Sequence, residues 1–148
     1  MARNDWVTFQ EFSLDLANGV HNLGSDTFKV ALIDNTTAPT AADATPRWAD
    51  YSANEVSGTG YTAGGYTLTG VSTSEAAGVT TFDDTGNVLW SQNAAGPTDI
   101  YWAVLYNDSA SADQAIGFLD MGGAVSLVDG DVSITWNASG ILTVTVSA

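Results

Sequence analysis

The stretch Ile100-Tyr-Trp-Ala-Val-Leu-Tyr106 is apolar on both of the faces that an extended strand presents. Successive side chains of a strand point to opposite sides of a sheet, so a strand of this kind is buried on both sides. We therefore expect it at the centre of a sheet. A second sheet should cover one of its faces, and a helix or a partner should cover the other.

Further runs with the period-two pattern of strands lie on either side of this stretch, separated by turn signals at short spacing. Together they predict eight strands, at residues 27–33, 66–72, 79–83, 87–91, 100–107, 114–121, 131–136 and 141–146. The last two flank Asn137-Ala-Ser-Gly140 and predict a C-terminal hairpin. The fold class is mainly β, an antiparallel β-sandwich of jelly-roll type with one N-terminal α-helix.

The N-terminal helix is expected over about residues 8–19. Thr8 and Glu11 match the spacing of a capping box, and Gly19 offers a left-handed stop. Apolar residues recur at spacings of three and four, on one helical face: Phe9, Phe12, Leu16 and Val20. We interpret the two phenylalanines as packing on the core, with a partner-facing surface as the alternative.

A long loop is predicted over residues 34–58, which are rich in Ala, Thr, Asp and Pro and leave room for a short helical turn. Its aromatic residues Trp48 and Tyr51 either pack inward, which we favour, or form a contact patch for a partner. The glycine-rich stretch Glu55–Gly70, EVSGTGYTAGGYTLTG, then leads into the sheet. Its glycines favour tight turns and a close approach of two backbones.

Composition sets the outer limits of the function. The 148 residues suit a single domain spanning 1–148, and there is no cysteine for disulfides or thiolate metal sites. The 17 acidic and three basic residues give a net charge of −14, which opposes nucleic-acid binding because phosphate contacts need Lys and Arg. No apolar run is long enough for a membrane span, and no export signal is recognisable.

No constellation of residues announces catalysis. The pairs Asp83-Asp84 and Asp129-Gly-Asp131 could offer oxygen ligands to Ca²⁺ or Mg²⁺, but we interpret them as turn formers. A carboxylate pair in a glycosidase cleft is a weaker hypothesis. His21 lacks a visible nucleophile and orienting partner, so we assign it a structural hydrogen bond. The sequence thus predicts no enzyme, no cofactor and no metal site.

Four short motifs resemble a family of small structural proteins of tailed bacteriophages. They are Gly19-Val-His-Asn-Leu23, Asp26-Thr-Phe-Lys-Val-Ala-Leu32, Gly60-Tyr-Thr-Ala-Gly-Gly65 and Ala103-Val-Leu-Tyr-Asn107. Their order and spacing agree with that family from about Phe9 to about Trp136. The resemblance implies a virion component made in the bacterial cytoplasm, and we expect a capsid decoration or cement protein that bridges major capsid protein subunits.

The resemblance also implies a homo-oligomer, for which a trimer is favoured. Aromatic residues and Arg dominate many protein interfaces, so the expected partner contacts are Trp6, Arg47, Trp48 and Tyr51. The alternative is a tail or head-fibre module that binds a receptor or glycan. In that case Trp48, Tyr51 or Tyr61 would stack on sugar rings.

Overall fold

The computed structural model describes residues 6–86 and 88–147. Within them the chain forms two short α-helices, α1 (Phe12–Ala17) and α2 (Trp48–Tyr51), and a 3-10 turn at Ser52–Asn54. The strands are β1 (Trp6–Thr8), β2 (Phe28–Ile33), β3 (Tyr66–Thr67), β4 (Val71–Ala76), β5 (Val79–Asp84), β6 (Val88–Trp90), β7 (Ile100–Asn107), β8 (Ala115–Val125), β9 (Val132–Ile134) and β10 (Leu142–Thr145).

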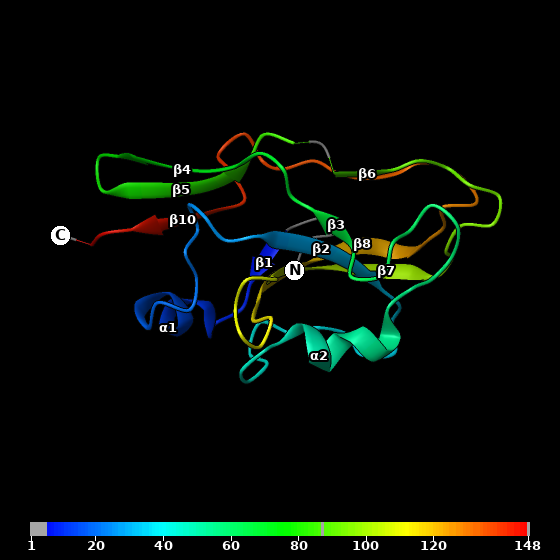
Figure 1. Cartoon of the computed structure of the whole chain (residues 1–148), viewed down its shortest axis with the longest axis horizontal. Coiled ribbons are helices and arrows are strands. Elements are labelled where there is room, and N and C mark those ends of the chain that lie inside the picture. The colour runs from blue at the N-terminus through cyan, green and yellow to red at the C-terminus, as the bar shows by residue number, and fades with distance from the viewer. Residues whose placement is uncertain (1–5, 87, 148) are drawn as a thin grey trace.

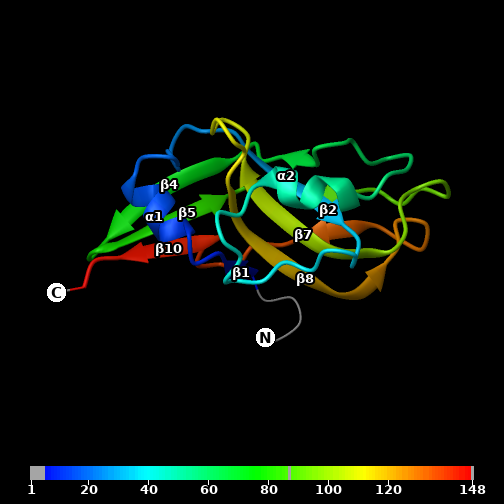
Figure 2. The ribbon, with the colours of Figure 1, turned by 90° about the horizontal axis from the view of Figure 1, so that it is seen from below.

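The strands form a mainly antiparallel, sandwich-like arrangement. A five-stranded sheet in the order β1-β8-β7-β2-β3 lies in the middle of the molecule. Two smaller sheets, β10-β5-β4 and β6-β9, lie on one side of it, and α2 lies on the other (Figure 1). Phe12 of α1 belongs to the core that the main sheet shares with the small sheets. Seen from below, α2 crosses β7 and β2, whereas α1 lies beneath the three-stranded sheet (Figure 2). No helix in the described part of the chain is long and apolar enough to cross a membrane.

The central position of β7 is confirmed, because β7 pairs with β2 on one side and with β8 on the other. Its alternating side chains enter two different cores. Ala103 and Leu105 face the small sheets, and Val104 and Tyr106 face α2. A strand with one polar face would place polar side chains in one of these cores, which explains why both faces of β7 are apolar.

The two cores differ in what they contain. The larger one packs the aliphatic residues of the main sheet and the small sheets around Phe28 and Phe82, whose ring centroids lie 5.0 Å apart. The smaller one is largely aromatic and holds Phe9, Trp48, Tyr51, Tyr106 and Phe118. This smaller core forms only because the long loop, which carries Trp48 and Tyr51, folds back over the main sheet.

The predicted C-terminal hairpin is wrong, although its turn is present. The amide of Gly140 donates to the carbonyl of Asn137 at 2.8 Å, and Gly140 has a φ of 90°. The strands that flank this turn nevertheless separate, because β9 pairs with β6 and β10 pairs with β5. The alternating pattern correctly indicates strands but contains no information about which strands pair.

The N-terminal helix is shorter than the predicted 8–19. Thr8 ends β1, and the amide of Phe9 donates to the carbonyl of Ile116 at 3.0 Å, so the first predicted turn belongs to the sheet. The expected capping box is absent, since Glu11 at the helix start makes no side-chain cap. Gly19 does take the left-handed conformation, with a φ of 72°. Phe9 and Phe12 are both buried, as expected.

Two strand predictions also change. The run 66–72 divides into β3 and β4, which belong to different sheets, and β1 adds an edge strand that was not expected. Asn87, the first residue of the predicted strand 87–91, lies outside the described residues. The remainder of that strand is present as β6, which ends at Trp90. The short helical turn expected in the 34–58 loop is present as α2.

The glycine motif lies against β2 through a hydrogen-bond network. The Tyr61 hydroxyl donates to Glu55 Oε1 at 2.7 Å and accepts from the Leu32 amide at 2.9 Å. Burial raises the pKa of Tyr61 far above its ordinary value, so its hydroxyl keeps its proton. Glu55 Oε1 also accepts from the Gly64 amide, and the Tyr106 hydroxyl donates to the Gly64 carbonyl at 2.7 Å. The motif is thereby fixed to the edge of the main sheet.

Candidate partner-binding groove

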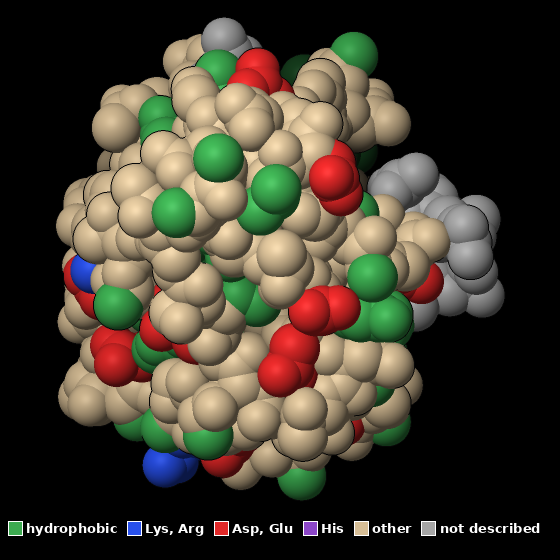
Figure 3. All heavy atoms as spheres, turned by 90° about the vertical axis from the view of Figure 1, so that its right-hand side faces the viewer, with side chains coloured by type: hydrophobic (Ala, Val, Ile, Leu, Met, Phe, Trp, Pro, Cys, Tyr) green, Lys and Arg blue, Asp and Glu red, His purple; other side chains and the backbone are tan. Residues whose placement is uncertain are grey.

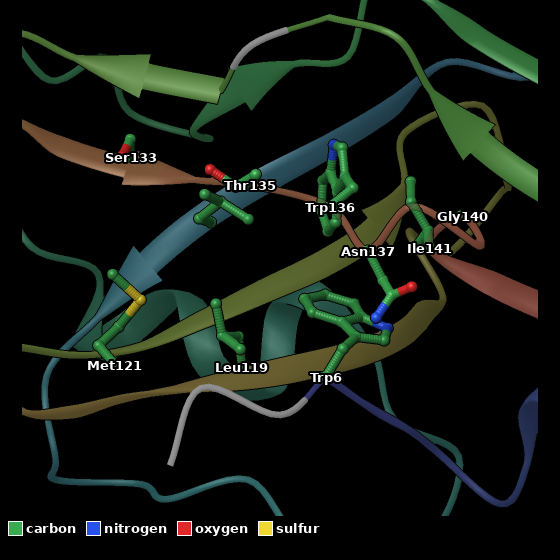
Figure 4. A pocket seen from close by; sticks show the side chains of 10 residues that line it. Trp6, Leu119, Met121, Ser133, Thr135, Trp136, Asn137, Gly140 and Ile141 are labelled. Atoms are coloured by element: carbon green, nitrogen blue, oxygen red, sulfur yellow. The ribbon is translucent and has the colours of Figure 1, made fainter.

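A groove of about 650 Å³ opens between the main sheet and the small sheets, beside β1, β8 and β9. We call it the tryptophan groove, because Trp6 and Trp136 meet there in an edge-to-face contact with ring centroids 5.5 Å apart and an interplanar angle of 83°. Leu119 and Met121 extend into it from β8 (Figure 4). The remaining lining residues are Ser133, Ile134, Thr135, Asn137, Gly140 and Ile141.

The position of Trp6 follows from strand pairing and from a missing side chain. β1 pairs with β8 so that Trp6 lies opposite Leu119. A Cβ on Gly117 would lie 2.5 Å from the Val7 carbonyl oxygen and 2.9 Å from the indole nitrogen of Trp6, so only glycine permits this approach. The indole nitrogen is buried and has no hydrogen-bond partner within the described residues.

The position of Trp136 depends on the buried carboxylate of Asp84. The Trp136 indole N–H donates to Asp84 Oδ2 at 3.4 Å, while Asp84 Oδ1 accepts from the Gly70 amide at 2.7 Å and the Gly86 amide at 3.2 Å. Asp84 is 4% exposed, and its carboxylate oxygens accept these hydrogen bonds at the point where β5 meets the wall of the groove. Asp83 and Asp84 end β5 rather than forming the turn that we expected, although Asp84 Oδ1 does accept from the amide of Gly86, two residues further on.

The groove offers two kinds of contact to a ligand. Indole rings and the side chains of Leu119, Met121 and Ile141 offer apolar area, and each tryptophan can bury a large surface. The hydroxyl groups of Ser133 and Thr135 and the amide of Asn137 line the same space. Such a surface suits an apolar side chain on an extended polypeptide, or a sugar ring with polar groups at its edge.

The other expected contact residues lie elsewhere. Trp48 stacks on Tyr106 with ring centroids 5.1 Å apart and an interplanar angle of 6°, and Tyr51 packs on Phe9. Trp48 is 9% exposed and Tyr51 is 2% exposed. The expectation that these two rings contact a partner or stack on sugars is wrong, because both lie in the smaller core. Arg47 is exposed; it directly precedes α2, and its backbone forms an isolated bridge with Gln114.

Tyr51 also fixes the long loop through its hydroxyl, which donates to Asp43 Oδ2 at 2.7 Å. Burial opposes ionisation of Asp43, but hydrogen bonds from Thr40 and Tyr51 outweigh it and lower the pKa of that carboxyl. Burial and the Asp43 carboxylate raise the pKa of Tyr51 far above its ordinary value. This contact keeps the aromatic layer closed over the main sheet.

His21 is a buried structural residue. Its ring stacks on Phe12 with centroids 5.5 Å apart, and its Nδ1 lies 3.1 Å from the Asn107 side-chain nitrogen. That amide nitrogen is a donor, so Nδ1 accepts and Nε2 carries the proton of the neutral ring. Burial lowers the pKa of His21, against the opposing charges of Asp15 and Asp26.

The remaining candidates do not assemble into a reactive cluster. Asp131 Oδ1 accepts a hydrogen bond from the Gln92 amide at 2.7 Å. The Tyr61 ring, which was a candidate for stacking on sugars, packs against Trp90. Among the residues that the structure describes, no three His, Asp or Glu side chains lie close enough to hold a metal ion.

Comparison with known proteins adds no relative to this picture. No protein-family model, no curated protein and no solved structure matches the chain.

Sequence reasoning identified Trp6 but missed the residues that complete its groove. Trp136 is the last alternating residue of a predicted strand, and Met121 lies at the end of another, so both read as core positions. The pairing of β1 with β8 places Met121 near Trp6, whereas Trp136 reaches Trp6 through its contact with Asp84. The Gly117 that admits the indole gives no signal in the sequence beyond its being a glycine inside a strand.

Proposed function

We propose that the chain is a non-enzymatic decoration protein of a tailed-bacteriophage capsid, which binds the outside of the shell and bridges major capsid protein subunits. The observation that supports this most directly is the tryptophan groove, a recess that places two indole rings beside polar side chains. The resemblance of the four sequence motifs to phage structural proteins supplies the class of partner. The buried carboxylate of Asp84 and the buried ring of His21 both serve internal hydrogen bonds, which agrees with a binding role.

The groove provides a physical basis for cementing a shell. A partner side chain that enters it loses contact with water on most of its surface, and tryptophan-lined pockets of this kind carry much of the binding energy at interfaces. A ligand that binds only the assembled shell stabilises that shell by mass action. Binding of many copies across subunit boundaries would therefore raise shell stability without any catalysis.

The same proposal includes self-association. Most soluble homo-oligomers have closed symmetry, and a trimer on the shell would suit the threefold positions of an icosahedral capsid. Each copy would then present one tryptophan groove to the subunit beneath it.

A tail or head-fibre module that binds a receptor or glycan is the second candidate. It is favoured by the polar groups beside the tryptophans, since Thr135 and Asn137 could hydrogen-bond the hydroxyl groups of a sugar stacked on an indole. Copy number separates the two candidates, because a decoration protein covers the shell and a fibre module occurs at few positions.

The test measures binding of purified protein to shells that lack it. Trp136→Ala should weaken binding about thirtyfold or more, which corresponds to a loss of about 2 kcal/mol at an interface hot spot. Met121→Glu, which places a charge in the groove, should weaken it as well. Leu14→Ala is the matched control, since Leu14 is a 52% exposed apolar residue on α1, outside the groove.

Circular dichroism and thermal melting must show that each variant is folded. A chelator should leave the wild-type protein on the shell. Unchanged binding of both groove variants would contradict the proposed role of the groove, and release by a chelator would reveal a metal-dependent contact instead.

A further inference from the structure

The charges of this protein are strongly segregated. Residues 132–148 contain no charged side chain, and residues 56–82 contain only Glu75, although the chain as a whole has 17 acidic residues and three basic ones. These two segments supply β4, β10 and all but the last two residues of β5. The three-stranded sheet β10-β5-β4, which we call the arm, therefore carries charge only at Glu75 and at the Asp83-Asp84 end of β5. Asp and Glu side chains are visible on the end of the molecule opposite this arm (Figure 3).

The β4 edge of this arm is long, regular and unpaired. β4 pairs with β5 from Val71 opposite Asp84 to Ala76 opposite Val79, with no bulge, and it ends the sheet on that side among the described strands. Ser72 to Ala76 are exposed. Proteins usually protect such an edge with Lys, Pro or a bulge, and β4 has none of these.

The direction of the free backbone groups follows from the ladder. The Thr85 amide donates to the Gly70 carbonyl at 3.1 Å, so Gly70 and Thr85 form a hydrogen-bonded pair. Bonding alternates along an antiparallel strand, which makes Ser72, Ser74 and Ala76 bond inward to β5. The N–H and C=O groups of the intervening residues, Val71, Thr73 and Glu75, therefore point away from β5 towards the open edge.

We propose that this β4 edge is a self-association surface, at which β4 of a second copy of this chain pairs antiparallel across a twofold axis. The two three-stranded sheets would then form one continuous six-stranded sheet. This inference concerns the free protein in solution and does not depend on its proposed place in a virion, where a trimer would form only on the shell.

One register satisfies the edge completely. When the axis passes through Thr73, this residue pairs with its own copy, and Val71 pairs with Glu75 of the second copy. All three outward-facing residues of each strand then exchange hydrogen bonds. Like charges do not face each other, because Glu75 lies opposite Val71. A register centred on Ser74 would leave Val71 unpaired.

The charge pattern selects a second copy as the occupant. Two molecules with a net charge of −14 repel one another, and they can approach most easily where both carry little charge. The β4 edge carries a single carboxylate, and Glu75 Oε1 already accepts from the Gly78 amide at 2.7 Å. The uncharged β10 edge on the other side of the sheet belongs to a strand of only four residues, so it offers fewer outward-facing backbone groups. A basic partner strand would be attracted more strongly to the acidic surfaces elsewhere on the molecule than to the β4 edge.

Analytical ultracentrifugation of the full chain tests the proposal. The wild-type protein should sediment as a dimer, with twice the mass of the 15.3 kDa chain, and the dimer should tighten with added salt because screening weakens repulsion. Thr73→Pro removes an N–H that points to the open edge, so the variant should be a folded monomer. Thr143→Pro is the matched control on the opposite free edge, at β10, and should remain dimeric.

Cysteine cross-linking tests the register, because the chain has no cysteine of its own. In the Thr73-centred register the two Thr73 Cα atoms lie about 5.5 Å apart, within disulfide range, so Thr73→Cys should cross-link on oxidation. Two Ser74 Cα atoms would lie about 8 Å apart, so Ser74→Cys should not. A wild-type monomer or trimer, a dimer that survives Thr73→Pro, or cross-linking of Ser74→Cys in place of Thr73→Cys would overturn the proposal.

Discussion

Gly65 offers a sharp test of how the glycine motif is fixed to the main sheet. Its φ is +87°, and a Cβ placed there would lie 2.1 Å from the Val30 carbonyl oxygen and 2.6 Å from the Ala31 Cα. Gly64 next to it has nearly the same φ, +86°, but its Cβ would meet only the Tyr106 hydroxyl, at 3.4 Å. The two substitutions Gly65→Ala and Gly64→Ala therefore share backbone strain and differ in the clash.

The expected magnitudes follow from these two contributions. A left-handed conformation costs an alanine about 1 to 2 kcal/mol, and both variants lose that much. Gly65→Ala must also push the motif off β2, where Tyr66 pairs with Val30 and the Tyr106 hydroxyl reaches the Gly64 carbonyl. Loss of these two contacts adds about 1 kcal/mol each. We expect Gly65→Ala to lower the free energy of unfolding by about 3 to 4 kcal/mol, and Gly64→Ala by about 1 to 2 kcal/mol.

Urea denaturation measures both free energies, and thermal melting gives an independent comparison. A difference of about 2 kcal/mol corresponds to about 4 to 8 °C in Tm for a domain of this size. Equal destabilisation by the two variants would refute the close approach of Gly65 to β2. It would leave backbone strain as the whole effect.

Three further substitutions test the cores and the buried histidine. Trp48→Ala should lower the free energy of unfolding by about 3 to 5 kcal/mol in urea denaturation, because the indole stacks in the smaller core; a variant as stable as wild type would show that the ring is dispensable there. Phe12→Ala should cost a similar amount, about 3 to 5 kcal/mol, whereas loss of shell binding with unchanged melting would place Phe12 at a partner interface. Burial lowers the pKa of His21, so below the ordinary pKa of about 6.5 the unfolded chain binds a proton that the folded chain does not, and stability falls as the pH falls. Unfolding free energies at pH 7 and pH 5 should therefore differ more for the wild type than for His21→Gln, and an equal difference would exclude His21 as the source.

Much of the architecture could be predicted from local patterns. The two apolar faces of β7 led correctly to a central strand between two cores, and Phe9 and Phe12 were correctly placed inside. The errors occur where pairing between distant segments decides the outcome. Thr8 and Phe9 match a helix start, but the edge of β8 recruits them into the sheet. The turn at Asn137–Gly140 likewise predicts a hairpin, but β9 pairs with β6 and β10 pairs with β5, which belong to two different sheets.

The candidate groove was predictable only in part. An N-terminal tryptophan stood out as a contact residue, but Trp136 comes from the other end of the chain and reaches Trp6 only after folding. Conversely, Trp48 and Tyr51 have the residue types of an interface, and only their stacking on Tyr106 and Phe9 shows that they belong to the core. The β4 edge required the strand order, because its exposure depends on which strand ends the sheet.

A density map of the virion at side-chain resolution tests the central claim most directly. We expect this protein in many copies on the outer surface of the capsid, with the tryptophan groove between Trp6 and Trp136 filled by a segment of the major capsid protein. A few copies confined to the tail or to head fibres, or a groove that faces solvent while another surface contacts the shell, would contradict it.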